Sequence, residues 1–115
     1  GMPACVEAAM LAKMSDRGQI AGCVVDGPLA LDVALCKEAA EIKKLKSEVA
    51  GDADCLVFPS IEAANVFYKL GGHFIPGVKM AAMVAGAKAP CVLSSRADST
   101  ETKLNSIALA ALTAK

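Results

Sequence analysis

The stretch SSRADSTETK, residues 94–103, contains residue types that can bind an anion. A helix is predicted to begin within it, so backbone N–H groups should be exposed there. A guanidinium near the positive end of a helix is unfavourable unless an anion is bound beside it. Helix-end N–H groups, the Ser95 hydroxyl and the Arg96 guanidinium together suit a phosphate group. The residues alone leave two alternatives: a phosphate site, or an ordinary surface arginine.

The same stretch has a simpler structural use. Either Asp98 or Ser99 can cap the helix, and Glu101 lies at capping-box spacing from Asp98. Capping explains these carboxylates and hydroxyls, but it leaves the Ser-Arg pair unexplained. His73 is the only histidine and lies in LGGHF, where nothing indicates a catalytic triad. We therefore do not interpret Ser95 as a nucleophile.

The cysteines indicate neither a disulfide framework nor a metal site. There are five, an odd number, and no two of them are within four residues of each other. Each lies in an apolar run, which predicts buried, reduced thiols and a cytoplasmic protein.

Composition limits the classes of function. The 115 residues are 55% hydrophobic and 21% charged, which predicts one compact domain over 1–115 and excludes a disordered tail. Twelve basic and twelve acidic residues cancel, and aromatic residues are few, so we expect no nucleic-acid partner. No apolar run approaches the roughly 20 residues of a membrane span, and we expect no membrane partner and no secretory leader.

Hydrophobic periodicity supplies the elements that would position these residues. Helices are predicted at 4–17, 29–44, 61–70 and 99–114, and strands at 19–27, 50–59, 77–87 and 89–95. Their alternation predicts a three-layer α/β fold with a mostly parallel sheet of about four or five strands. Functional residues of such sheets lie in loops beyond the strand ends, here VDGPLALD, FPSIEAAN and SSRADS.

Three motifs carry a family resemblance. VVDGPLALDVAL, KSEVAGDADCLVFPSIEAANVFYK and VAGAKAPCVLSSRADSTETKLNSIALA together resemble the C-terminal part of the phosphate acetyl/butyryltransferase family, with the butyryltransferase branch nearest. The resemblance covers almost the whole chain in order. It implies a fold like one domain of isopropylmalate and isocitrate dehydrogenases. The implied reaction converts acyl-CoA and phosphate to acyl phosphate and CoA, with coenzyme A as a substrate and no tightly bound cofactor.

The resemblance also assigns roles to residues. Ser95 and Arg96 match the family's Ser-Arg pair, so Ser95 would hydrogen-bond near the thioester and Arg96 would supply charge to phosphate. Glu62, Asn65 and Ser99 are its candidate substrate-binding residues; the alternative for Glu62 is that it is only a first-turn helix carboxylate.

Some positions depart from the family pattern. The acetyltransferase branch has a basic Asp seven residues after the Ser, where this chain has Thr102. The neighbouring Glu101 either acts as the base or only caps the helix. In the FPSIEAAN loop, Ser60 stands where the family usually has Asp, which removes a negative charge. Ala64 stands where the family usually has Gly, and its Cβ leaves less room for another group to approach the backbone closely.

The largest departure is length, because family members have a further N-terminal domain with phosphate-holding arginines. Three hypotheses follow: an acyltransferase part that works with a separately encoded N-terminal half, a CoA- or phosphate-binding module without turnover, or an oligomerising remnant. A homo-oligomer is expected, with the 61–70 helix and residues 80–87 as contact surface. A dehydrogenase relative is disfavoured, since no GxGxxG follows a strand and no aspartate cluster for a metal is evident.

Overall fold

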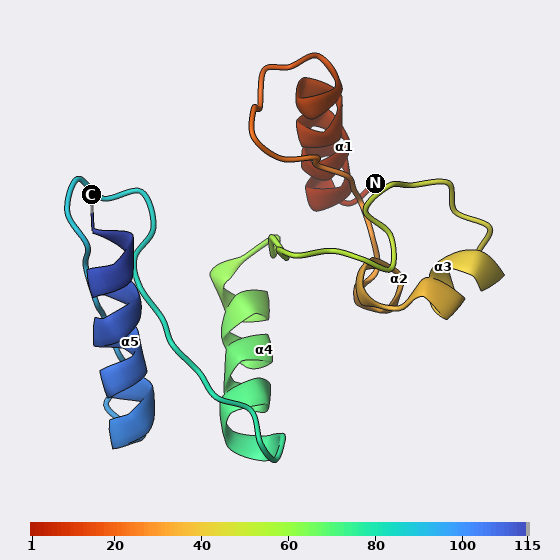
Figure 1. The fold of residues 1–115 in the computed structure, drawn as a ribbon. Helices are drawn as coiled ribbons and strands as arrows, with labels where there is room; N and C mark the ends of the chain where they lie inside the picture. Colours follow the sequence, from red (N-terminus) through yellow and green to blue (C-terminus); the bar gives the residue numbers. More distant parts are fainter. Residues whose placement is uncertain (115) are drawn as a thin grey trace. The chain divides into compact units, whose positions relative to one another are not determined.

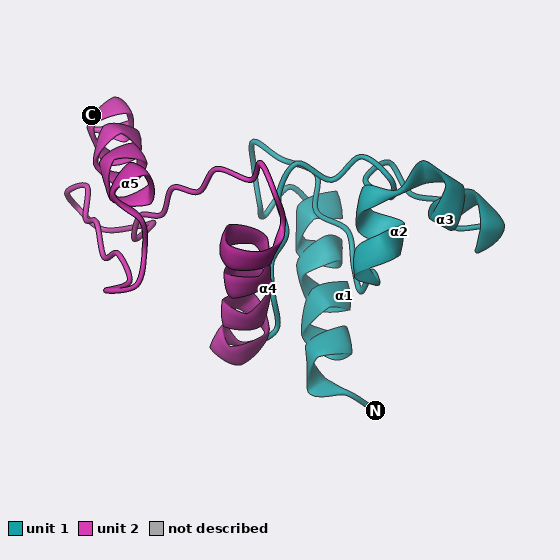
Figure 2. Ribbon diagram, turned by 90° about the horizontal axis from the view of Figure 1, so that it is seen from below, with its two compact units in different colours: residues 1–59 teal, residues 60–115 magenta. Residues whose placement is uncertain are grey.

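The computed structural model describes residues 1–114, which contain five helices (Figure 1). They are α1 (Pro3–Asp16), α2 (Leu31–Leu35), α3 (Lys37–Ile42), α4 (Ile61–Phe74) and α5 (Thr100–Thr113). The chain divides into two compact units, Gly1–Pro59 and Ser60–Lys115, which Figure 2 distinguishes by colour. The single domain expected over 1–115 is thus described as two units, each taken separately below.

The expected three-layer α/β fold with a mostly parallel sheet is wrong for the described residues. Their only β-pairing is one isolated antiparallel bridge, in which Val84 N–H donates to the Cys91 carbonyl at 2.9 Å. The other apolar runs predicted as strands are irregular connecting segments. A β-branched, apolar composition favours a pleated, half-buried surface. It does not by itself provide the neighbouring chain whose hydrogen bonds make a strand.

The first unit is built around α1. Pro3 occupies the first turn, where its missing N–H costs nothing, and the helix ends at Asp16, one residue from the prediction. The segment after it returns to the helix, because Val25 N–H donates to the Ser15 hydroxyl at 3.2 Å. Gly27 completes this contact, since a Cβ there would lie 3.1 Å from the Ala8 Cβ.

The helix predicted over 29–44 is interrupted at Cys36, whose φ of −124° and ψ of 114° are extended. The carbonyls of Val33 and Ala34 explain the interruption. Instead of bonding within a continuing helix, both accept from Gly51 N–H, at 2.8 and 3.1 Å. Gly51 has a φ of +81°, and a Cβ there would lie 2.7 Å from the Cα of Lys37. Only glycine fits this approach, and the core of the unit forms beneath it, at Val33, Ala34 and Ala40.

The second unit contains α4, α5 and the segment that connects them. Its α4 continues through Gly71 and Gly72 to Phe74, four residues beyond the predicted end. Residues of α4 and of the start of α5, both helices being drawn in Figure 1, line one pocket. Between the helices, residues 75–99 cross back along α5, where Ala82 N–H donates 2.9 Å to the hydroxyl of the fully buried Ser106.

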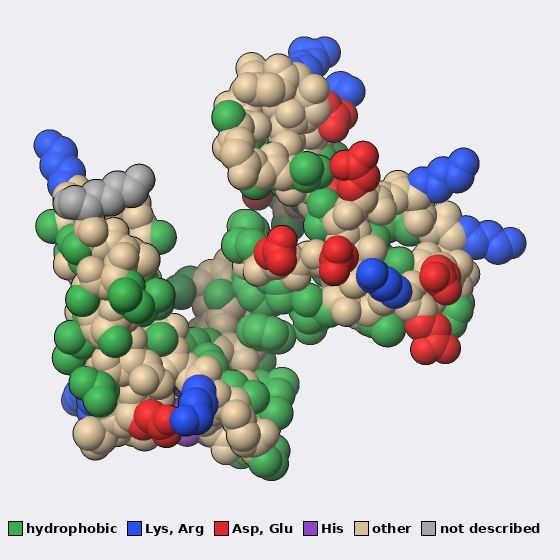
Figure 3. Space-filling view, in the orientation of Figure 1, with side chains coloured by type: hydrophobic (Ala, Val, Ile, Leu, Met, Phe, Trp, Pro, Cys, Tyr) green, Lys and Arg blue, Asp and Glu red, His purple; other side chains and the backbone are tan. Residues whose placement is uncertain are grey.

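All five cysteines are free, but the prediction that they are buried is wrong. Cys5 is half-buried and the other four are exposed. Their apolar surroundings in the sequence are largely exposed as well: the face in Figure 3 has apolar side chains spread over α5 and charged ones gathered around α3. Within residues 1–114, each helix is too short or too polar to cross a bilayer.

Candidate functional site

A tight turn carries the predicted Ser-Arg pair immediately before α5. Asp98 N–H donates to the Ser95 carbonyl at 3.1 Å, which makes Arg96 and Ala97 the two central residues of a β-turn. Ser95 is half-buried and Arg96 is exposed. The turn therefore presents the guanidinium to solvent at the start of the helix, as an anion site requires.

The Asp98 carboxylate closes the turn from the other side. Its Oδ2 accepts from Ser95 N–H at 2.8 Å and, over a longer 3.4 Å, from the Tyr68 hydroxyl on α4. Partial burial, followed by the negative charge and hydrogen bond of Asp98, raises the pKa of Tyr68. Lys69 Nζ lies 5.4 Å from the centroid of the same ring. Asp98 thus links the Ser-Arg turn to a helix thirty residues earlier in the chain.

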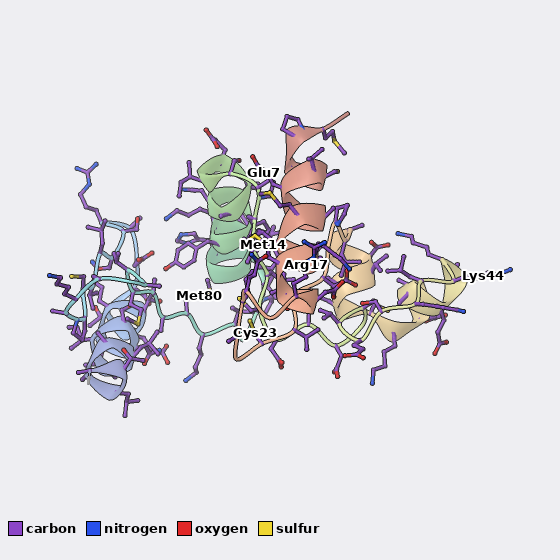
Figure 4. All side chains as sticks on the ribbon, turned by 90° about the horizontal axis from the view of Figure 1, so that it is seen from above. Glu7, Met14, Arg17, Cys23, Lys44 and Met80 are labelled. Atoms are coloured by element: carbon purple, nitrogen blue, oxygen red, sulfur yellow. The ribbon has the colours of Figure 1, made fainter. Side chains whose placement is uncertain are left out.

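A small pocket of about 140 Å³ lies next to this link. It lies between α4 and the start of α5 and is lined by Tyr68, Gly72, His73, Met80, Ala97, Asp98, Ser99 and Thr102. Met80, labelled in Figure 4, forms one wall. A Cβ at Gly72 would lie 3.4 Å from the Met80 Cγ, so the glycine gives this side chain its space. Arg96 and Ser95 lie beside the pocket lining and are not part of it.

Ser99 is the N-cap of α5, which was one of the two predicted caps. Its hydroxyl accepts from Thr102 N–H at 3.1 Å and lies 3.0 Å from the Thr102 hydroxyl. Asp98 precedes the cap and forms no capping box with Glu101. Part of the anion-binding capacity of this helix end is consequently used by Ser99 itself.

Glu101 pairs with Lys79, whose Nζ lies 2.8 Å from its Oε1. Both side chains are exposed, and the hydrogen bond, followed by the charge of Glu101, raises the pKa of Lys79. Glu101 was predicted either to act as the base or to cap the helix. The capping box with Asp98 is absent among the described residues. The carboxylate is held instead by a lysine ammonium, and this pair brings a second cation to the start of α5.

Glu62 and Asn65 lie on α4, toward the end opposite the Ser-Arg turn. They precede Tyr68 by six and three residues, or roughly 9 and 4.5 Å along the helix axis. The hydrogen bond from its own N–H, then one from the Ser60 hydroxyl, lowers the pKa of Glu62. Ser60 caps the helix by accepting from Ala63 N–H at 3.3 Å. Glu62 therefore acts as a first-turn carboxylate, and Asn65 is exposed on the next turn.

Two contacts at this site were missed from sequence. The sequence places Tyr68 in an apolar helix, and nothing in it pairs Tyr68 with Asp98. Lys103 was not singled out, although its Nζ donates to the Arg96 carbonyl at 3.4 Å. A lysine seven residues after an arginine is a usable signal when a helix begins between them, because the first helical turn then lies against the preceding loop.

Comparison with known proteins identifies the family. Residues 2–111 match the model of the family described as phosphate acetyl/butaryl transferase. The chain therefore belongs to the phosphate acetyl/butyryltransferase family, as its motifs predicted.

Relatives from both branches of the family are similar. The chain is 59% identical over 113 residues to a phosphate butyryltransferase of Clostridium acetobutylicum, covering 98% of this chain and 37% of that protein. It is 55% identical over 111 residues to a phosphate acetyltransferase of Thermotoga maritima, covering 96% and 37%. The chain thus spans little more than a third of the length of these curated relatives.

A solved structure is also similar. The crystal structure of a branched-chain phosphotransacylase from Enterococcus faecalis V583 matches with a TM-score of 0.80 at 37% identity. The match covers 96% of this chain and 39% of the other.

Proposed function

We propose that this chain forms the part of a phosphate acyltransferase that supplies the Ser95-Arg96 turn to the reacting groups. The substrates are inorganic phosphate and a short-chain acyl-CoA, butyryl-CoA or acetyl-CoA. Family membership supports the reaction class. The observation that carries the site is the β-turn that places Arg96 at the start of α5, with its guanidinium exposed.

The reaction follows from the groups involved. A phosphate oxygen attacks the thioester carbonyl carbon, the carbon–sulfur bond breaks, and the CoA thiolate leaves and takes up a proton. Arg96 would hold the phosphate dianion in line with the carbonyl. The Ser95 hydroxyl accepts a long 3.4 Å bond from Ala97 N–H, and its own hydrogen has no acceptor within residues 1–114. That hydrogen can donate to the carbonyl oxygen, where negative charge develops.

Glu101 is the proposed acid–base group, and its carboxylate is paired with the Lys79 ammonium in this structure. The proposed setting is cytoplasmic, since the five free thiols suit a reducing compartment. The proposed assembly is a homo-oligomer. The lone chain covers only 37% of its relatives, so we expect it to turn over slowly or not at all by itself, because a site open to water loses electrostatic strength.

The test measures acyl phosphate as its hydroxamate after incubation with butyryl-CoA or acetyl-CoA and phosphate. The purified chain is assayed alone and together with the segment of the Clostridium acetobutylicum enzyme that it does not match. We expect turnover to rise on complementation. In Arg96→Ala we expect turnover to fall roughly tenfold to a hundredfold, because a hydrogen bond to a charged group is lost.

Arg17→Ala is the matched control, because Arg17 is the only other arginine and lies exposed after α1. Equal activity of Arg96→Ala and Arg17→Ala would contradict the proposed site. Absence of both turnover and CoA binding in every combination would contradict the proposed function and leave an oligomerising remnant.

A further inference from the structure

The Ser-Arg turn is connected to α4 through a single carboxylate oxygen, which suggests a role beyond local structure. Asp98 Oδ2 accepts from Ser95 N–H at 2.8 Å and from the Tyr68 hydroxyl at 3.4 Å. The Asp98 N–H in turn donates to the Ser95 carbonyl at 3.1 Å. Ser95 is thus fixed at both its backbone N–H and its carbonyl by one residue.

This arrangement determines where Arg96 points. In a β-turn the directions of the two central side chains follow from the backbone angles, and here those residues are Arg96 and Ala97. Loss of the Asp98 carboxylate would free the N–H of Ser95 and loosen the turn. Loss of the Tyr68 hydroxyl would free the turn from α4 while leaving the turn itself closed. Asp98 therefore keeps the turn closed, and Tyr68 holds the closed turn against α4.

We propose that Asp98 and Tyr68 are positioning residues that hold the Ser95-Arg96 turn in the orientation that binds the phosphate and thioester groups of the substrates. The inference rests on the proposed function, since it concerns the same site. Neither residue was among the candidate site residues found from sequence. Their contribution is orientation: a displacement of about 1 Å at a reacting group can cost on the order of a hundredfold in rate.

Burial also favours this role over a simple surface contact. Tyr68, Asp98 and Ser95 are all half-buried, whereas Arg96 is exposed. A hydrogen bond to a carboxylate is stronger when water has limited access. The half-buried residues Tyr68, Asp98 and Ser95 thus form a fixed base from which the exposed guanidinium of Arg96 extends.

The chain offers a specific probe of the contact, because Tyr68 is its only tyrosine and it has no tryptophan. Absorbance of the phenolate near 295 nm therefore titrates Tyr68 alone. Groups that face this phenol are Asp98, the Lys69 ammonium and His73 in the shared pocket. In Asp98→Asn the midpoint should fall toward the ordinary value of about 10. In Asp54→Asn, a control at an exposed aspartate of the first unit, it should stay unchanged.

Binding of coenzyme A and of inorganic phosphate to the purified chain, each measured by calorimetry, tests the role itself. We expect Tyr68→Phe and Asp98→Asn each to weaken binding roughly threefold to tenfold, and Asp98→Ala to weaken it more, because alanine also removes the acceptor for Ser95 N–H. Asn keeps a carbonyl acceptor and should rescue part of the loss. Thermal unfolding of each variant shows whether affinity falls without a matching fall in stability.

The outcomes distinguish failure of the positioning role from failure of the proposed function. Suppose that the unsubstituted chain binds the probes and that Arg96→Ala abolishes binding. If Tyr68→Phe and Asp98→Ala then bind as tightly as the unsubstituted chain, the positioning role is overturned and the site stands. Affinity losses that only track the loss of stability would also overturn it. If the unsubstituted chain binds neither probe, the proposed function fails, and the positioning role fails with it.

Discussion

Ser106 is the most buried polar side chain among the described residues, with no exposed surface at all. Its hydroxyl donates to the Thr102 carbonyl at 2.7 Å and accepts from Ala82 N–H at 2.9 Å. It therefore fastens the segment that returns from α4 to the middle of α5. Without it, the Ala82 N–H would lose its acceptor.

Substitution of Ser106 by alanine should accordingly destabilise the second unit. We expect a loss of about 1–3 kcal/mol, the cost of leaving a donor unsatisfied, measured as a shift in the midpoint of chemical denaturation. Ser94→Ala is the matched control, since Ser94 is half-buried but makes no hydrogen bond through its side chain within residues 1–114. Equal effects of the two substitutions would contradict a specific role for the Ser106 hydroxyl.

Glu62 provides a prediction for pH. Its pKa in the folded chain is lowered from 4.5 by its own N–H and by the Ser60 hydroxyl. A lowered folded pKa means that the contribution to stability is present above the unfolded value and is lost as pH falls through the folded value. We expect the carboxyl carbon of Glu62 to titrate below 4.5 in NMR spectra, and Ser60→Ala to move its midpoint upward. An unchanged midpoint in Ser60→Ala would contradict the hydrogen bond from the Ser60 hydroxyl to the Glu62 carboxylate.

The end of α3 shows how a single element is terminated. Lys44 has a φ of +53°, the only positive φ of a non-glycine residue in the described chain. Leu45 N–H donates to the Ala40 carbonyl at 3.1 Å and Lys44 N–H to the Glu41 carbonyl at 2.9 Å. This is the pattern of a Schellman motif, in which glycine is the favoured residue at the left-handed position.

Lys44→Gly should therefore stabilise the first unit by up to about 1 kcal/mol, because relief of the left-handed strain exceeds the added backbone entropy of glycine. Thermal unfolding followed by circular dichroism measures the effect. Lys46→Gly, at an exposed lysine two residues later without a positive φ, should instead be neutral or destabilising. A stabilisation of equal size in both would point to charge removal as the cause.

Sequence patterns predicted some elements better than others. The boundaries of α1 and α5 are each within one residue of prediction, since Pro3 and Ser99 mark their starts through local chemistry. The break at Cys36 depends on Gly51, fifteen residues away, whose N–H takes the carbonyls of α2. No local pattern contains that information. The predicted sheet failed for the same reason, because pairing is a property of two segments and apolar composition of only one.

The candidate site divides in the same way. Ser95, Arg96 and Ser99 were found because a turn, a helix cap and a family motif coincide in one short stretch. Tyr68 and Asp98 are thirty residues apart and meet through α4 and α5. Their contact depends on where the turn before α5 lies relative to α4, which no local sequence pattern encodes.

At the scale of the whole molecule, the distribution of apolar surface is the dominant feature. Only four apolar side chains are buried among the described residues, Val33, Ala34, Ala40 and Ala110, and all are small. Large side chains remain exposed in both units. Surfaces of this kind mark contacts with other chains or segments, which agrees with a chain that spans 37% of its relatives.

The clearest such surface is a stripe on α4, formed by Val66, Leu70 and Phe74 at intervals of four residues. They are 69%, 51% and 75% exposed, and their spacing places them on one face of the helix. Burial of apolar surface contributes roughly 25 cal/mol per Å². We therefore expect the purified chain to self-associate through this stripe, as dimers or larger species in sedimentation velocity at micromolar concentrations.

A pair of charged variants tests this surface. Val66→Lys with Phe74→Lys should shift the chain toward monomer, because two buried ammonium groups without partners are strongly unfavourable. Leu112→Lys is the matched control on α5, where Leu112 is 84% exposed but lies outside the stripe. It should leave the sedimentation profile unchanged. If the unsubstituted chain sediments only as monomer, self-association is contradicted. If only Leu112→Lys loses association, the contact surface lies on α5 and not on α4.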